Sequence, residues 1–80
     1  MEAPLTDLAK NETGVVTGFV DPDAELTVRL REIGFAEGDS VTPLHFGLFG
    51  RNPISVRVNG ALIALRKQDA RSVLVRRTGG

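Results

Sequence analysis

The side chains in this chain that could support chemistry are few and widely spaced. The sequence contains no cysteine, and its single histidine, His45, lies between Leu44 and Phe46 in an apolar segment. No nucleophile is therefore paired with a general base at a spacing that supports catalysis. We expect a protein that is not an enzyme, with no catalytic residue and no cofactor.

Two arrangements of carboxylates could hold a metal ion, but each has a simpler structural explanation. Asp21 and Asp23 are spaced as a pair for a hard cation, yet they precede a predicted helix, where aspartate is a common capping residue. His45 could join Asp39 or Glu37 as a ligand, although a lone strand histidine is more often a polar residue at a barrel rim. We therefore expect no metal-ligating residue.

Signals for phosphate, nucleic-acid or Pro-rich ligands are also weak. The glycine-flanked segments 34–38 and 47–50 lack the Lys-Ser/Thr ending of a phosphate-binding loop. The chain has four Phe but no Tyr or Trp, so it offers little for base stacking or for a groove that binds Pro-rich peptides. We expect no nucleic-acid partner.

Length and charge describe one small domain with an uneven charge distribution. The 80 residues predict a single domain over residues 1–80, with a frayed tail at 78–80. Nine of the ten acidic residues lie in positions 1–40, and seven of the ten basic residues lie in positions 41–80. Either these charges mix on the folded surface, or a basic face meets an acidic partner. No apolar run approaches the ~20 residues that span a bilayer, and the chain starts without the pattern of an export signal.

One amphipathic helix is predicted over residues Asp23 to Ile33. Leu26, Leu30 and Ile33 recur at the spacing of one helical face, so we expect them to dock against the rest of the protein. Asp21 or Asp23 can cap the start of the helix, and Gly34 suits the residue that ends it.

The remaining segments predict strands joined by turns. Asn59-Gly60 is the strongest hairpin signal, because both central residues of a type I′ turn need positive φ. Short helical turns are expected at Leu5 to Ala9 and at Lys67 to Arg71. The expected strands are Gly14 to Val20, Ser40 to Phe46, Ile54 to Val58, Ala61 to Arg66 and Ser72 to Arg77. Five short strands with one helix favour a mainly β, closed or nearly closed barrel.

The segment 47–52 between two of these strands reads as a loop with apolar side chains. Leu48 and Phe49 are flanked by Gly47 and Gly50, and Phe46 comes just before them. These side chains either plug an open end of the barrel or form an exposed contact patch.

Three spaced motifs resemble the FeoA family, the small cytoplasmic proteins that accompany the bacterial ferrous iron transporter. Segment 29–41, RLREIGFAEGDSV, resembles the core motif of that family. Segment 52–60, NPISVRVNG, is similar to a second motif, and segment 62–70, LIALRKQDA, to a third, with Asp69 where the family usually has Glu. The matches run in order through nearly the whole chain.

This resemblance implies an SH3-like barrel of about five strands with one short helix inserted after the first strand. It implies a non-enzymatic cytoplasmic accessory or regulator of ferrous iron uptake. The implied partner is the ferrous iron permease with its GTPase domain, and the membrane is reached only through that permease. Weak self-association stays open. Leu30, Ile33 and Phe35 are expected in the core, and Ala64 with Leu65 is expected to pack the hairpin.

We expect the protein-binding surface to include four residues of the loop and one arginine of the third motif: Phe46, Leu48, Phe49, Arg51 and Arg66. The same fold occurs as the carboxy-terminal domain of iron-dependent transcriptional repressors, which provides an alternative function. The chain shows no helix-turn-helix and begins with Met1, so a free-standing protein is favoured. A third alternative, a ferrous ion carrier, would need a ligand cluster that the scattered carboxylates do not offer.

Overall fold

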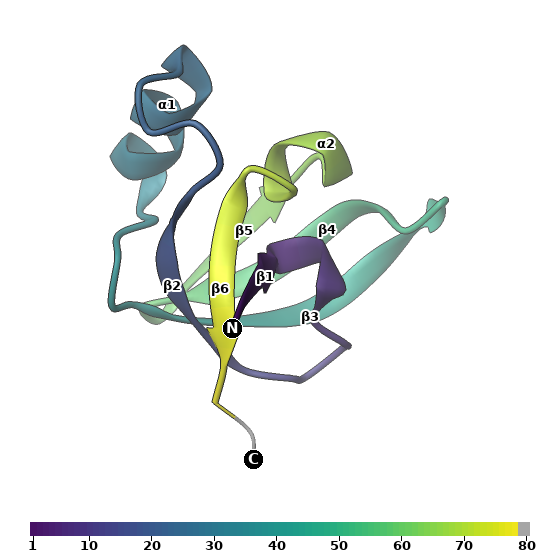
Figure 1. Cartoon of the computed structure of the whole chain (residues 1–80). Helices are drawn as coiled ribbons and strands as arrows, with labels where there is room; N and C mark the ends of the chain where they lie inside the picture. Colours follow the sequence, from purple (N-terminus) through teal and green to yellow (C-terminus); the bar gives the residue numbers. More distant parts are fainter. Residues whose placement is uncertain (79–80) are drawn as a thin grey trace.

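The computed structural model describes residues 1–78, which form a curled β-sheet with three short helical elements (Figure 1). In chain order the elements are β1 (Glu2–Pro4), the 3-10 turn η1 (Leu5–Asp7), β2 (Gly14–Phe19), α1 (Glu25–Ile33), β3 (Ser40–Phe49), β4 (Asn52–Val58), β5 (Ala61–Leu65), α2 (Lys67–Ala70) and β6 (Val73–Arg77). The predicted mainly β fold, with one helix inserted between the first two long strands, is confirmed. The three-residue strand β1 was not predicted.

The sheet is antiparallel throughout and has the strand order β1-β6-β2-β3-β4-β5. In Figure 1 the sheet curls on itself, with β6 in front of β5, as expected for a nearly closed barrel. The ladder between β2 and β3 is short, with only Gly14↔Val41 and Val15↔Ser40 in register. Because β1 and β5 are the outermost strands in this order, they form the two edges of the sheet.

Side-chain alternation along the strands builds the core. Successive strand residues point to opposite faces, so Val56 and Val75 are fully buried while Arg57 and Arg76 remain exposed. Phe35, which follows α1, is completely buried, and Leu5 and Leu8 from the opening segment join the same cluster. Burying each such side chain contributes about 1.5–3 kcal/mol relative to exposure.

The start of helix α1 differs from the prediction. Its N-cap is Ala24, and no side chain caps the first turn, so the predicted capping by Asp21 or Asp23 is wrong. The Asp21 carboxylate instead accepts a hydrogen bond from the Asp23 backbone N–H (3.1 Å), and the buried Thr27 hydroxyl donates to the Asp21 carbonyl (2.5 Å). These bonds form a turn ahead of the helix, which draws the Asp21 carboxylate away from the free N–H groups of α1.

The end of α1 agrees with the prediction at Gly34 and disagrees at Ile33. Gly34 ends the helix with φ of +129°, a conformation that disfavours residues with a Cβ atom. Leu30 is buried and Leu26 packs against the core, but Ile33 is 49% exposed and is not a core residue. Its side chain instead lines a groove between α1 and β5.

The predicted loop over residues 47–52 is wrong. Strand β3 continues to Phe49, which pairs with Asn52, and the chain reverses at Gly50 and Arg51, with φ of +64° and +66°. A Cβ atom on Gly47 would clash with the Asn52 carbonyl oxygen and lie 2.5 Å from its carbonyl carbon. The absence of a side chain at Gly47 therefore lets the two strands continue side by side.

The remaining turns follow the sequence closely. Asn59 and Gly60 both have positive φ, 50° and 84°, as the type I′ hairpin prediction requires. Both expected helical turns are present, as η1 and α2, each shorter than predicted. Thr78, where we expected a frayed tail to begin, donates backbone and side-chain hydrogen bonds to the Thr13 carbonyl. Residues 79–80 lie outside the part of the chain that the structure describes.

Candidate functional site

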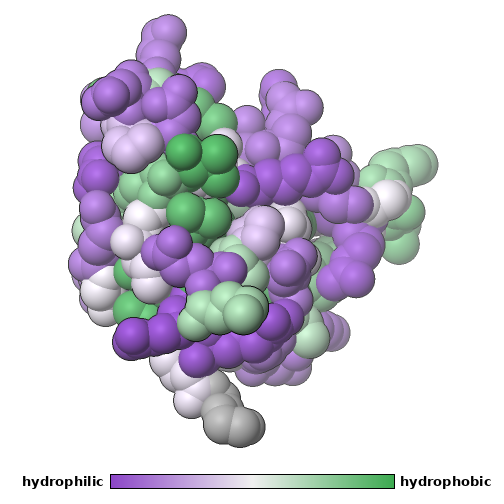
Figure 2. Space-filling model, in the orientation of Figure 1, coloured by the Kyte–Doolittle hydropathy of each residue, from purple (hydrophilic) through white to green (hydrophobic). Residues whose placement is uncertain are grey.

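Apart from Met1 at the start of the chain, the most exposed large apolar side chains of residues 1–78 lie at the tip of the β3–β4 hairpin. Leu48 is 94% exposed and Phe49 is 85% exposed, so the alternative in which these two residues plug the barrel is wrong. In Figure 1 this hairpin projects to the right of the barrel, and Figure 2 shows apolar surface at the same extremity. The hairpin thus presents an apolar tip to solvent.

The base of the hairpin is held by contacts to the barrel and to α2. Phe46 is partly buried against the core, and the Arg51 guanidinium lies 4.0 Å from the centre of its ring. The Lys67 backbone N–H donates to the Asn52 side-chain carbonyl (3.0 Å), and the Lys67 ammonium donates to the Gly50 carbonyl (3.4 Å). The stacked guanidinium and the bonds from α2 give the exposed tip a defined orientation.

The structure brings together four of the five predicted binding residues. Phe46, Leu48, Phe49 and Arg51 share the hairpin, whereas Arg66 lines a separate groove between α1, β5 and α2. This groove has a volume of about 470 Å³ and is lined by apolar residues with basic, acidic and amide side chains among them: Leu26, Arg29, Leu30, Ile33, Ala64, Leu65, Arg66, Gln68 and Asp69. Figure 2 shows apolar surface on the side of α1 that faces the barrel.

Sequence reasoning missed this groove. It forms because α1 and β5, more than 25 residues apart in the chain, face one another across the end of the barrel. The groove explains why Ile33 is exposed although it was expected in the core. The Ile33 side chain completes the apolar stripe of α1, but it faces the groove and not the core. The helical periodicity identified the stripe but not what lies opposite it.

Charged residues are unevenly distributed around the hairpin tip and the groove. Between Asp39 and Asp69 the sequence contains no acidic residue, although it contains Arg51, Arg57, Arg66 and Lys67. Strands β3, β4 and β5 therefore form an acid-free part of the sheet. Within residues 1–78 the two ion pairs are Arg31–Glu37 and Arg77–Glu12, each with a closest distance of 2.7 Å, and neither involves a residue of this part of the sheet.

Two of the four carboxylates considered as metal ligands, those of Asp21 and Glu37, accept hydrogen bonds from other groups. Arg31 donates two hydrogen bonds to Glu37, and these bonds are the main reason that the pKa of Glu37 is lowered. His45 is exposed on β3. Residues 1–78 contain no cluster of three or more His, Cys, Asp or Glu side chains with the geometry of a metal site.

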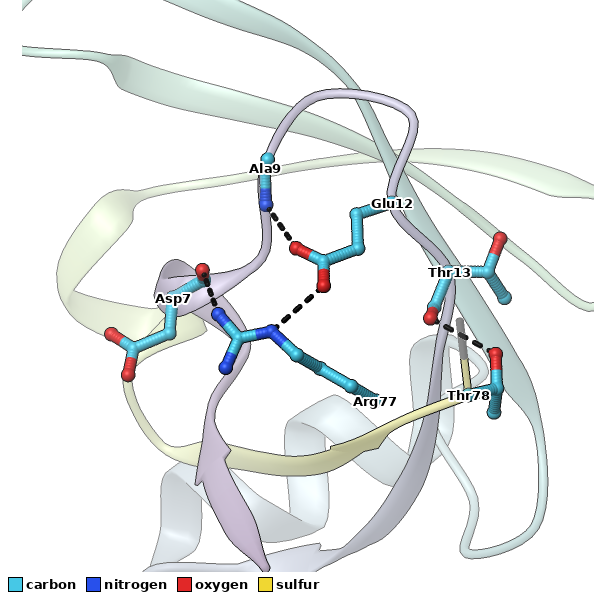
Figure 3. A network of polar contacts seen from close by, with 6 residues as sticks. All are labelled: Asp7, Ala9, Glu12, Thr13, Arg77 and Thr78. Carbon is cyan, nitrogen blue, oxygen red and sulfur yellow. Dashed lines mark hydrogen bonds and ion pairs between the residues drawn. The ribbon is translucent and has the colours of Figure 1, made fainter. Parts of the chain in front are cut away.

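A second polar network ties the two ends of the chain together (Figure 3). Arg77 donates to the Glu12 carboxylate (2.7 Å) and to the Asp7 carbonyl (2.7 Å), while the Ala9 backbone N–H donates to the other Glu12 oxygen (2.8 Å). The bond from Ala9 is the largest cause of the lowered pKa of Glu12, and Arg77 adds to it. The network fastens the loop before β2 to β6, which indicates a structural role.

Residues 3–77 match the FeoA domain family. This chain belongs to that family. The match begins within β1 and spans all the later strands and both helices of the described structure, in agreement with the three sequence motifs that suggested it. No protein with a curated functional description matches the sequence at a significant level. Within residues 1–78, no helix is both long enough and apolar enough to cross a membrane.

Solved structures similar to this FeoA-family chain confirm the SH3-like fold. FeoA of Stenotrophomonas maltophilia in complex with zinc, described as a prokaryotic SH3 domain protein, is 31% identical, with 91% of this chain and 88% of that chain covered and a TM-score of 0.78. A FeoA-like protein from Clostridium acetobutylicum is 23% identical, with 99% and 90% covered and a TM-score of 0.89. A manganese-dependent transcriptional repressor bound to manganese is 23% identical, with a TM-score of 0.84 over 95% of this chain but only 36% of that chain.

Proposed function

We propose that this FeoA-family chain is a non-enzymatic, cytoplasmic accessory protein of ferrous iron uptake that acts by binding the GTPase-bearing ferrous iron permease. Family membership supports the iron transport role, and the Stenotrophomonas protein is described as a candidate activating factor for ferrous iron transport. A protein without a catalytic constellation can regulate a transporter through binding alone.

The exposed hairpin tip is the observation that supports a binding role most directly. Leu48 and Phe49 are almost fully solvated, although burying such side chains is favourable by about 1.5–3 kcal/mol each. Protein interfaces are enriched in aromatic and arginine side chains, and a few residues near the centre of the patch carry most of the binding energy. The hairpin supplies Phe49 as the anchor, with Leu48 next to it at the tip, Arg51 at the turn and Phe46 at the base.

The experiment is an NMR titration of the labelled chain with the soluble GTPase domain of the permease, with and without guanine nucleotide and ferrous ion. We expect localised shifts from Phe46 to Arg51, and association that weakens as salt rises, because exposed charges are screened beyond about 8 Å at physiological ionic strength. The substitution Phe49→Ser should weaken binding at least about tenfold without unfolding the chain.

Val20→Ser is the matched control, because Val20 is also exposed and apolar but lies outside the hairpin. A Phe49→Ser protein that folds normally and binds the GTPase domain as well as the parent would contradict the assignment of the tip. Shifts that appear with ferrous ion alone would favour a metal-responsive module instead. A titration without any shift would mean that the GTPase domain is not the partner.

A regulatory domain related to the carboxy-terminal domain of metal-dependent repressors is the second candidate. The observation that favours it is the similarity to the manganese-dependent repressor, of which this fold is one part. The two candidates make different predictions for the gene neighbourhood: a permease gene alongside supports the accessory protein, whereas a repressor gene context without a permease supports the regulatory domain.

A further inference from the structure

Strand β5 forms an unprotected edge of the sheet. It is the last strand in the sheet order and consists of five apolar residues, Ala61–Leu65, without a charge, a proline or a shift in register. Edge strands usually carry such features because their free N–H and C=O groups invite pairing with another chain. The opposite edge, β1, has only three residues and ends at Pro4.

The register shows which backbone groups of β5 are free. Pro43 is paired with Val56 across β3 and β4 and has no N–H, and its carbonyl accepts a hydrogen bond from Asn11 (2.7 Å). The backbone groups of Val56 therefore point to β5, where its partner is Ile63. Because hydrogen-bonding directions alternate along a strand, the N–H and C=O groups of Leu62 and Ala64 point away from β4, toward the open edge.

The groove described above lies beside this edge. Ala64, whose backbone groups are free, is one of its lining residues, and the apolar side chains of Leu26, Leu30 and Ile33 from α1 face it. A strand edge next to a helix is the arrangement in which several domains bind extended peptides by adding a strand. The volume of about 470 Å³ lies in the range of ligand-binding clefts.

The charged side chains that line the groove indicate which kind of ligand it favours. Arg29 and Arg66 both line it, and neither takes part in an ion pair within residues 1–78. Asp69 is the one acidic residue of the lining. Arginine binds carboxylates with paired, charge-assisted hydrogen bonds, so the groove favours a ligand with acidic groups at the end where β5 runs into α2.

We propose that the groove between α1 and β5 binds an extended peptide that adds to β5 as an antiparallel strand. The peptide places apolar side chains against α1 and carboxylates against Arg29 and Arg66. This site is separate from the hairpin tip, and the inference does not rest on the contact with the permease.

The test is an NMR titration of the labelled chain with synthetic peptides of about six residues, the usual length of a strand. The acidic probe begins with two Glu residues and continues with alternating Val and Thr, because an antiparallel strand starts where β5 ends. A matched basic probe begins with two Lys residues, and a third probe is the acidic peptide with alternate residues N-methylated. We expect shifts along β5 and α1, slowed hydrogen exchange at Leu62 and Ala64, and at least about tenfold tighter binding of the acidic probe than of the basic one.

Two variants make the test specific. Arg66→Glu should weaken binding of the acidic probe about tenfold, and the variant should bind the basic probe more tightly than the acidic one. Ala64→Pro removes an N–H that the fold does not use and should abolish binding, provided that the spectrum stays native. Three results would each overturn the proposal. The first is that the N-methylated probe binds as well as the acidic probe, and the second is that the shifts occur at the hairpin tip. The third is a concentration-dependent shift of β5 without peptide, which would indicate pairing between two copies of the chain.

Discussion

Replacing Gly47 with alanine tests the geometry that holds the hairpin tip in place. Gly47 lies on β3, and a Cβ atom there would contact the Asn52 carbonyl oxygen, would be 2.5 Å from its carbonyl carbon and 2.7 Å from Pro53 Cδ. These neighbours are backbone or ring atoms, so they cannot move aside like the end of a flexible side chain. The two strands must separate, or the hairpin must change its register.

The cost of Gly47→Ala follows from this overlap. Overpacking of a well-packed site costs about 1–3 kcal/mol, and here the clash involves backbone. Gly18→Ala is the matched control, because Gly18 also lies on a strand but a Cβ atom there would have no neighbour within 4 Å. A glycine within a strand lowers the stability of a protein by about 0.5–1 kcal/mol relative to alanine. Because the alanine side chain would meet no neighbour at this position, Gly18→Ala should be neutral or stabilising.

Thermal and urea unfolding measure both variants. In a domain of this size, each 1 kcal/mol shifts Tm by about 4–8 °C, so Gly47→Ala should melt clearly below the parent and Gly18→Ala at or above it. The backbone amide signals of Leu48 to Arg51 should move in Gly47→Ala alone. If Gly47→Ala is as stable as Gly18→Ala, with an unchanged hairpin spectrum, the close approach of β3 to Asn52 is refuted.

Two further predictions concern polar groups away from the candidate sites. The Thr17 hydroxyl is buried and has no hydrogen-bond partner within residues 1–78, so Thr17→Val should raise the free energy of unfolding by up to about 1 kcal/mol; a lower urea midpoint would contradict this. The pKa of Glu12 is lowered in the folded state, so its contribution to stability is present above the ordinary pKa of 4.5 and is lost as the pH falls through the folded value. When the pH falls below about 4.5, the Glu12→Gln variant should therefore lose less stability than the parent, as measured by urea unfolding at a series of pH values. An equally steep loss in the variant would show that Glu12 is not the source of this pH dependence of stability.

Local sequence patterns were sufficient for much of the fold. The alternation of Ile54, Val56 and Val58 identified a strand with one buried face, because side chains of a strand alternate between faces whatever the partner strand is. Asn59-Gly60 and Gly34 were informative for a similar reason, since positive φ is a property of the residue and its immediate backbone. The family motifs also lie in continuous segments and needed no tertiary information.

Features that depend on a distant partner were not accessible in this way. The sequence showed apolar residues at Phe46 to Phe49, but the partner backbone at Asn52 determines that they extend a strand and end in solvent. It showed an apolar stripe ending at Ile33, but only the placement of β5 opposite α1 leaves that residue in a groove. The sequence by itself therefore determined the faces of the regular strands, the turns at Gly34 and Asn59-Gly60, and the family of this protein. The tertiary structure alone decided which apolar faces remain uncovered, because burial is a property of the packed chain and not of the local pattern.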